Sequence, residues 1–198
     1  MFGRIRRSRP ERRARTATQS DPQILRVLGL DDFMRQAGGV TVTQDAALGV
    51  PAVWAAVNFI AGTIAGLPLH VYRRGAEGRQ RVSGGLAQVL HDAANDETSS
   101  FAWRKYTMEQ ILTTGRAFTF IERNGANQIV NLWPLDPGGM TVYLRDGRRE
   151  YHYTEPGGRR FVYESGEILD LDFMMQPDQV PPLSAILINP TVIGLAIE

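Results

Sequence analysis

An apolar run from Val50 to Leu69 leaves this chain few ways to fold, because Asn58 and Thr63 are its only polar side chains. Pro51 suits the first turn of a helix, where its missing N–H costs nothing, and Gly66-Leu67-Pro68 would end that helix. A helix of about 15 residues that is apolar on every side needs cover from the rest of the protein. The sequence therefore predicts a central, buried helix of a soluble domain, with small residues that let a neighbour approach closely.

A membrane-associated protein anchored by residues 50–66 is the alternative interpretation. Gly62-Thr63-Ile64-Ala65-Gly66 has the small-xxx-small spacing of packed membrane helices. However, about 15 residues at 1.5 Å per residue cover only about 22 Å, whereas the hydrocarbon layer is about 30 Å thick. No later segment is typical of a second span. The buried helix is the preferred interpretation, and no membrane partner is expected.

The composition excludes several classes of site. The chain has 198 residues and no cysteine. This length suits one domain, or one domain with a tail. Because cysteine is absent, disulfides, thiolate zinc sites and cysteine nucleophiles are excluded, and an intracellular setting is permitted.

The formal charge of +1 hides a strongly basic N-terminal segment. Seven arginines accompany one glutamate, Glu11, within residues 1–15, so the rest of the chain is mildly acidic. A charge-dense segment with almost nothing to bury is typical of a disordered arm, which we assign to residues 1–22. The alternative is an arm that binds nucleic acid or an acidic partner through counterion release. Its candidate residues are Arg4, Arg6, Arg7, Arg9, Arg12, Arg13 and Arg15.

The segments around the central helix alternate between helix and strand patterns. A short helix is predicted from Asp21 to Gly38, and a brief strand at residues 40–42. After the central helix, residues 67–72 alternate as a strand does. Residues 80–82 would pair with them as a hairpin across a polar turn at residues 75–78.

Two further helices follow the hairpin. Leu86, Val89 and Leu90 give one apolar face to a short helix that ends near Asn95. Ser99 or Ser100 would cap a longer, amphipathic helix that ends at Gly115. We expect the core face of that helix to consist of Phe101, Met108, Ile111 and Leu112.

The next 58 residues change to short β-rich runs separated by turn signals. Asn124-Gly125 and Asp146-Gly147 are strong hairpin pairs, because both residues of a type I′ turn need positive φ. An antiparallel meander is therefore predicted. Its strands are Ala117–Arg123, Ile129–Pro134, Met140–Arg145, Tyr151–Thr154, Arg160–Tyr163 and Ile168–Phe173.

The chain offers little for catalysis, so we expect neither an enzyme nor a cofactor. His70, His91 and His152 are predicted in a strand, a helix and a strand, without paired metal-ligand spacing. Glu167, Asp170 and Asp172 form an acidic cluster that could bind a divalent cation through oxygen ligands. In a strand only the two aspartates share a face, so a solvated strand face is the preferred interpretation. No nucleotide-binding or nucleophile motif is present.

These observations predict an α+β fold, in which the apolar central helix and the amphipathic helix pack on the antiparallel β-meander. The domain would span residues 23–182. Residues 183–198 have apolar residues at helix-compatible spacing and would begin a further helical region that the chain leaves unfinished.

Four blocks of residues, in order, resemble one family. The first is ALGVPAVWAAVNFIA at 47–61, followed by LPLHVYR at 67–73. The later blocks are FAWR at 101–104 with LTTGRAF at 112–118, NLWPLDP at 131–137 and GEILDL at 166–171. Over residues 40–172 the chain thus resembles the N-terminal part of the portal proteins of tailed bacteriophages with lambdoid-type heads. Similar prophages and gene transfer agents share this family. The chain departs from it at Asp170, where the family commonly has His, and at residues 182–185, where it commonly has Gly-Leu-Ser-Pro.

The resemblance implies a structural role as a head-to-tail connector. Family members form a homo-oligomeric ring at one vertex of the virion capsid, and double-stranded DNA is packaged and ejected through it without sequence reading. The implied partners are the terminase, the tail adaptor proteins and the major capsid protein. The implied location is the capsid vertex, or the bacterial host cytoplasm for a prophage product. The central helix and the strands would form the outer, wing-like domain, and neighbours would meet head to tail.

The family continues through stem and crown helices that have no counterpart here. We therefore expect a truncated portal that folds its wing-like domain but does not build a conducting channel. One rival hypothesis is a free-standing interaction module that binds capsid components or nucleic acid through the Arg-rich arm. The other is the membrane-associated protein described above.

Overall fold

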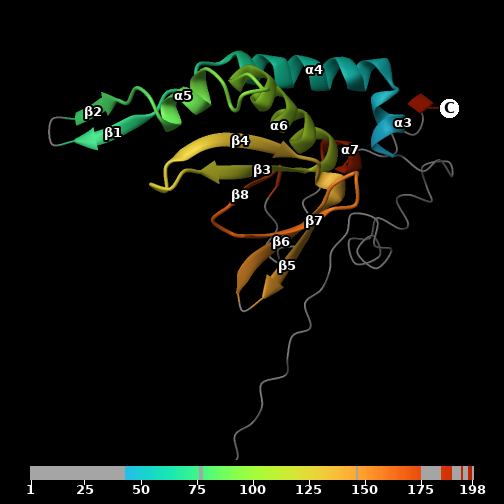
Figure 1. Ribbon diagram of the computed structural model, residues 1–198. Coiled ribbons are helices and arrows are strands. Elements are labelled where there is room, and N and C mark those ends of the chain that lie inside the picture. Colours follow the sequence, from blue (N-terminus) through green and yellow to red (C-terminus); the bar gives the residue numbers. More distant parts are fainter. Residues whose placement is uncertain are drawn as a thin grey trace, which may run out of the picture.

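Helices cover one sheet, and a second sheet lies beneath it, in the computed structural model of the chain (Figure 1). The structure describes residues 43–75, 78–145, 147–174, 184–188, 193 and 196–197. The helix predicted from Asp21, the strand predicted at 40–42 and the Arg-rich arm lie outside these residues. Helices and antiparallel strands occur together, so the predicted α+β class is confirmed.

The first seven described elements run from α3 to β3. They are α3 (Gln44–Leu48), α4 (Pro51–Gly66), β1 (Tyr72–Gly75), β2 (Gly78–Arg81), α5 (Leu86–His91), α6 (Ser100–Thr114) and β3 (Arg116–Arg123). The elements that follow are β4 (Ile129–Leu135), the 3-10 turn η1 (Pro137–Gly139), β5 (Met140–Arg145), β6 (Arg148–Thr154), β7 (Arg160–Glu164), β8 (Ile168–Asp172) and α7 (Ala185–Ile188).

The predicted limits of α4 are confirmed, but its burial is not. The helix has 16 residues, begins with Pro51 and ends before Leu67. Only Ala61 and Ala65 are buried, and the large apolar side chains of the helix are exposed. The expectation of a buried central helix is therefore wrong, because α4 lies on the outside of the molecule and rests on α6 through its small residues.

The limits of α6 are also as predicted, and its caps explain why. The Ser99 hydroxyl accepts a hydrogen bond from the Ala102 N–H, and Gly115 ends the helix with a φ of 84°. The predicted core face is confirmed at Leu112, which is buried, but it is wrong at Phe101, which is 46% exposed. The face toward the sheet instead carries Trp103 and Thr107. The Thr107 hydroxyl donates to the Trp103 carbonyl oxygen at 2.8 Å, so this polar residue can be buried at no cost in hydrogen bonds.

All six predicted strands are present, but they form two sheets instead of one continuous meander. In the first sheet, β3 lies between β4 and β8, and in the second β6 lies between β5 and β7. All these pairs are antiparallel. The prediction of a single meander is therefore wrong in its connectivity, because β8 returns to the free edge of β3.

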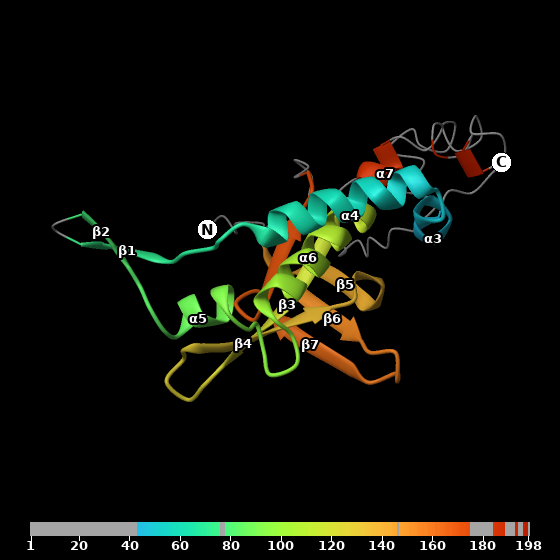
Figure 2. The same ribbon diagram turned by 90° about the horizontal axis from the view of Figure 1, so that it is seen from above.

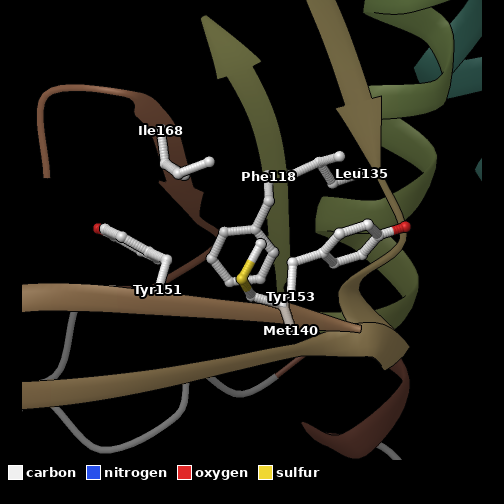
Figure 3. Packing of buried hydrophobic residues seen from close by; sticks show 6 residues of the cluster. All are labelled: Phe118, Leu135, Met140, Tyr151, Tyr153 and Ile168. Atoms are coloured by element: carbon white, nitrogen blue, oxygen red, sulfur yellow. The ribbon is translucent and has the colours of Figure 1, made fainter. Parts of the chain in front are cut away.

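The main hydrophobic core lies between the two sheets (Figure 3). The first sheet contributes Phe118, Ile168 and Leu135, and the second contributes Tyr151 and Tyr153, with Met140 at its start. The next residue along β3, Thr119, faces the helices and accepts a hydrogen bond from the Trp103 indole N–H at 3.0 Å. The alternation along β3 thus places one side of the first sheet against the second sheet and the other against α6.

The hairpin of β1 and β2 projects from the body, as both views show (Figures 1 and 2). It was predicted, but from residue 67 onward, whereas pairing begins at Tyr72 opposite Arg81. At the other end of α4, Ile186 of α7 packs with Ala47 of α3 and with Ile193. Among the described C-terminal residues, 185–188, 193 and 196–197 are helical.

Candidate assembly site

The outer face of α4 is an exposed, mainly apolar surface. It consists of Ala52, Ala56, Phe59, Ile60, Thr63 and Ile64, all of them exposed. Phe59 is 75% exposed and Ile60 40%. No charged residue occurs in α4. Figure 1 shows this helix along the edge of the molecule, with no described element covering its outer side.

Contacts with α6 fix which face of α4 points outward. The Lys105 ammonium group donates to the Asn58 side-chain oxygen at 3.0 Å, and the Arg104 guanidinium donates to the Leu67 carbonyl oxygen. Ala61 and Ala65 are fully buried between these polar contacts. A Cβ atom added at Gly62 or Gly66 would meet nothing within 4 Å. The close approach therefore uses the alanines, and the predicted small-xxx-small glycines do not contribute to it.

The chemistry of this surface suits another protein better than DNA. Phosphate groups are bound by arginine, lysine and backbone N–H groups, none of which the outer face of α4 offers. A contiguous apolar surface on a folded domain instead marks a protein or lipid contact. Within the described residues, no helix is long and apolar enough to cross a membrane.

The predicted acidic cluster forms ion pairs, so the expectation of a solvated strand face is wrong. The Asp170 and Asp172 side chains are only 6% and 17% exposed. Arg116, the strand partner of Asp172, places its guanidinium against both carboxylates. As predicted, Glu167 points elsewhere, where it accepts a hydrogen bond from the Glu164 N–H at 2.8 Å.

Asp170 also joins the two sheets. Its Oδ2 atom accepts hydrogen bonds from the Arg149 guanidinium at 2.7 Å and from the Tyr151 hydroxyl at 2.9 Å, both on β6. Loss of hydration raises the pKa of Asp170, although Arg116 and Arg149 oppose this shift. Burial, followed by the charge of Asp170, raises the pKa of Tyr151 to about 12.

This cluster stabilises the fold and does not form a metal site, because the guanidinium groups of Arg116 and Arg149 pair with the carboxylates that would otherwise bind a metal ion. Among the described residues, no group of three or more histidine, aspartate or glutamate side chains is placed to hold a metal ion. The sequence did not indicate Arg116 or Arg149 as partners. The signal that could have found them is the pairing of β3 with β8, which places Arg116 opposite Asp172.

The structure brings two of the three histidines together. The rings of His70 and His91 lie 5.2 Å apart, between their centroids, beside a cavity of about 250 Å³. Burial, then the nearby charges of Arg81 and His91, lower the pKa of His70. His70 precedes β1, so its predicted place in a strand is wrong, whereas His91 lies in α5 and His152 in β6, as predicted.

Comparisons with known proteins show which family this sequence is similar to. A sequence model of the family described as "Phage portal protein" matches residues 51–197. The portal protein of Enterobacteria phage HK97 is 28% identical over 119 residues, which cover 59% of this chain and 28% of that protein. The probable portal protein of Streptomyces phage phiC31 is 30% identical over 173 residues, 81% of this chain and 37% of that protein. The chain thus spans little more than a third of these relatives at most.

A solved structure has the same fold. The neck of an empty gene transfer agent particle, computed with C6 symmetry, contains a chain with a TM-score of 0.62 and 18% identity. The match covers 90% of this chain and 44% of that one. The fold similarity and the sequence match agree, and since the match from residue 51 to 197 takes in most of the sequence, this chain belongs to the phage portal protein family.

Proposed function

We propose that this chain is a portal subunit whose described residues build the wing-like part of a head-to-tail connector ring. The observation that carries this proposal is the family match over residues 51–197. The role is structural, and the ring would pass double-stranded DNA during packaging and ejection. Its partners would be the terminase, tail adaptor proteins and the major capsid protein. The product would lie at the capsid vertex of the virion, or in the bacterial host cytoplasm if it is expressed from a prophage.

The domain organisation belongs to the same proposal. Residues 1–22 would form the Arg-rich arm, residues 23–182 the wing-like domain, and residues 183–198 the start of a further helical region. The packing of Ile186 and Ile193 against Ala47 supports a direct junction between that helical region and the wing.

The outer face of α4 is the contact through which we expect one copy to meet the next. It is apolar and free of charge, which is typical of the buried centre of a subunit interface. Two similar structures are gene transfer agent necks computed with C6 and C12 symmetry. In a closed ring each contact is heterologous, so the outer face of α4 would pack on a different surface of the neighbour.

The mass of the purified chain in solution tests this contact. We expect the wild type to self-associate as its concentration rises, measured by light scattering after size-exclusion chromatography. Phe59→Ser should weaken that association at least about fivefold, because truncation of a central aromatic contact typically costs more than about 1 kcal/mol.

The matched control is Val162→Ser on β7, which removes a 60% exposed apolar side chain far from α4. It should leave the association unchanged. A wild-type chain that stays monomeric at every concentration would contradict the proposed contact, as would equal losses in the two variants.

A further inference from the structure

The projecting hairpin of β1 and β2 carries a ribbon of arginines. All eight of its strand residues are exposed. Arg74 lies directly opposite Arg79, and Tyr72 lies opposite Arg81. Directly opposed residues share a face of an antiparallel pair, and so do residues two apart on one strand. Three arginines and one tyrosine therefore lie on the same face, which we name the arginine face.

The charges on this face lack partners in the part of the chain that the structure describes. No carboxylate among those residues lies within ion-pair distance of Arg74, Arg79 or Arg81. Glu77 lies outside the described residues. Like charges directly opposite each other destabilise a strand pair. The hairpin thus keeps a repulsive arrangement that a bound anion would relieve.

A second hairpin of the same protein provides a contrast. At the end of β5 and β6, Arg145 lies directly opposite Arg148, so this hairpin also has two opposed arginines beside its turn. There, however, Arg145 lies 3.5 Å from a Glu150 carboxylate oxygen, and the neighbouring Arg149 pairs with Asp170 at 2.7 Å. Among the described residues, one arginine of the opposed pair therefore has a carboxylate partner in the second hairpin, whereas neither Arg74 nor Arg79 has one in the first.

We propose that the arginine face binds the phosphate backbone of duplex DNA, without reading its sequence. Arginine is the side chain that best matches phosphate, because its planar guanidinium can donate two parallel hydrogen bonds. Opposed side chains on a strand pair start about 5 Å apart, and those two apart on one strand about 7 Å. Guanidinium groups at these spacings can reach successive phosphates, which follow each other along one strand with a rise of about 3.4 Å.

The composition of the face favours nucleic acid over an acidic protein. Protein interfaces surround an apolar centre with a polar rim, whereas interfaces with DNA are polar and strongly positive. The arginine face has no aliphatic side chain, and its one aromatic residue, Tyr72, adds a hydroxyl donor. This assignment goes beyond the portal role, since the family match alone gives the hairpin no ligand.

Salt-dependent binding of the full chain to a labelled duplex of mixed sequence tests the proposal. Fluorescence anisotropy would be measured between about 50 and 200 mM salt for the wild type, for Arg74→Gln/Arg79→Gln and for Arg145→Gln/Arg148→Gln. Both variants lose two opposed arginines beside a turn, so their net charges are equal. The basic residues 1–15 are present in all three proteins, so their contribution cancels in the comparison.

We expect the hairpin variant to reduce the slope of log K against log salt by about 2, since each phosphate contact contributes about 0.9. The control variant should change it by much less. Equal changes in both variants, or no change in the hairpin variant, would overturn the proposal. So would a hairpin variant that binds DNA normally but self-associates less, because the face would then bind a second copy. The contact through α4 is judged by mass alone, so the two proposals can fail separately.

Discussion

At the scale of single residues, the carboxylate of Asp170 has the most demanding environment of the described part. It is nearly buried, and it serves as the acceptor for Arg149 and Tyr151 from the other sheet. Its Oδ1 atom has no hydrogen bond of its own and lies 2.9 Å from the Arg116 Nε atom. A buried carboxylate is tolerated only with such partners, because an isolated buried charge is strongly destabilising.

Removing the Tyr151 hydroxyl should therefore destabilise the fold. Tyr151→Phe deletes a hydrogen bond to a charged acceptor, so we expect the free energy of unfolding to fall by about 1–2 kcal/mol. Urea denaturation at about pH 8 measures this change. Tyr72→Phe, at an exposed tyrosine, is the control and should leave the free energy unchanged.

The same variant should also change the response to alkaline pH. The folded-state pKa of Tyr151 is about 12, above the ordinary value of 10.0. The hydroxyl therefore stabilises the fold fully below about pH 10, and this stabilisation is lost as the pH rises through about 12. Stability should decline less steeply over that range in Tyr151→Phe. Burial also raises the pKa of Tyr106 to about 12. Ionisation of Tyr106 should therefore cause part of the loss of stability at alkaline pH in both the wild type and the variant.

The sequence predicted the two aspartates of this ion-pair cluster but not its two arginines. The alternation of a strand is enough to place Asp170 and Asp172 on one face, and the structure agrees. The partners could not be predicted, because Arg116 and Arg149 come from other strands and reach the aspartates only after β8 pairs with β3. Exposure of a charged strand face depends on that pairing, so the predicted solvation was wrong.

At the scale of elements, the sequence predicted where a helix begins and ends, but it did not predict which side of the helix is buried. Pro51 and the Gly66-Leu67-Pro68 break determine α4 locally, so the sequence was sufficient for its length. Its buried face depends on where α6 crosses it. Since nearly every side of α4 is apolar, no pattern distinguished Ala61 and Ala65 from Phe59 before the structure was known.

The close contact between α4 and α6 should be sensitive to size at Ala65. Ala65→Leu places three more carbons where the side chain is fully buried, so we expect a loss of about 1–3 kcal/mol in the free energy of unfolding. Gly62→Ala is the control, because its new methyl group would enter open space. It should stabilise the helix by up to about 1 kcal/mol. Thermal denaturation followed by circular dichroism would measure both, and a harmless Ala65→Leu would contradict the contact.

At the scale of the whole molecule, the two sheets behave as one unit because they share a core. The strand sequences carried enough turn and alternation signals to predict every strand. The choice of partners was beyond them, since β8 could equally have continued from β7 as a fourth strand of the second sheet. What decides it is burial of Ile168 beside Phe118, a long-range contact that local patterns do not encode.

The shared core makes a prediction about cooperativity. Phe118→Ala should lower the free energy of unfolding by about 3–5 kcal/mol, because it empties a buried position next to the Tyr151 ring, 6.1 Å away between centroids. Hydrogen exchange should then accelerate in β5–β7 as much as in β3, β4 and β8. Val162→Ala, at an exposed position of β7, should change neither sheet. Faster exchange in the first sheet alone would mean that the sheets open separately, and the core between them would not be the element that unites the fold.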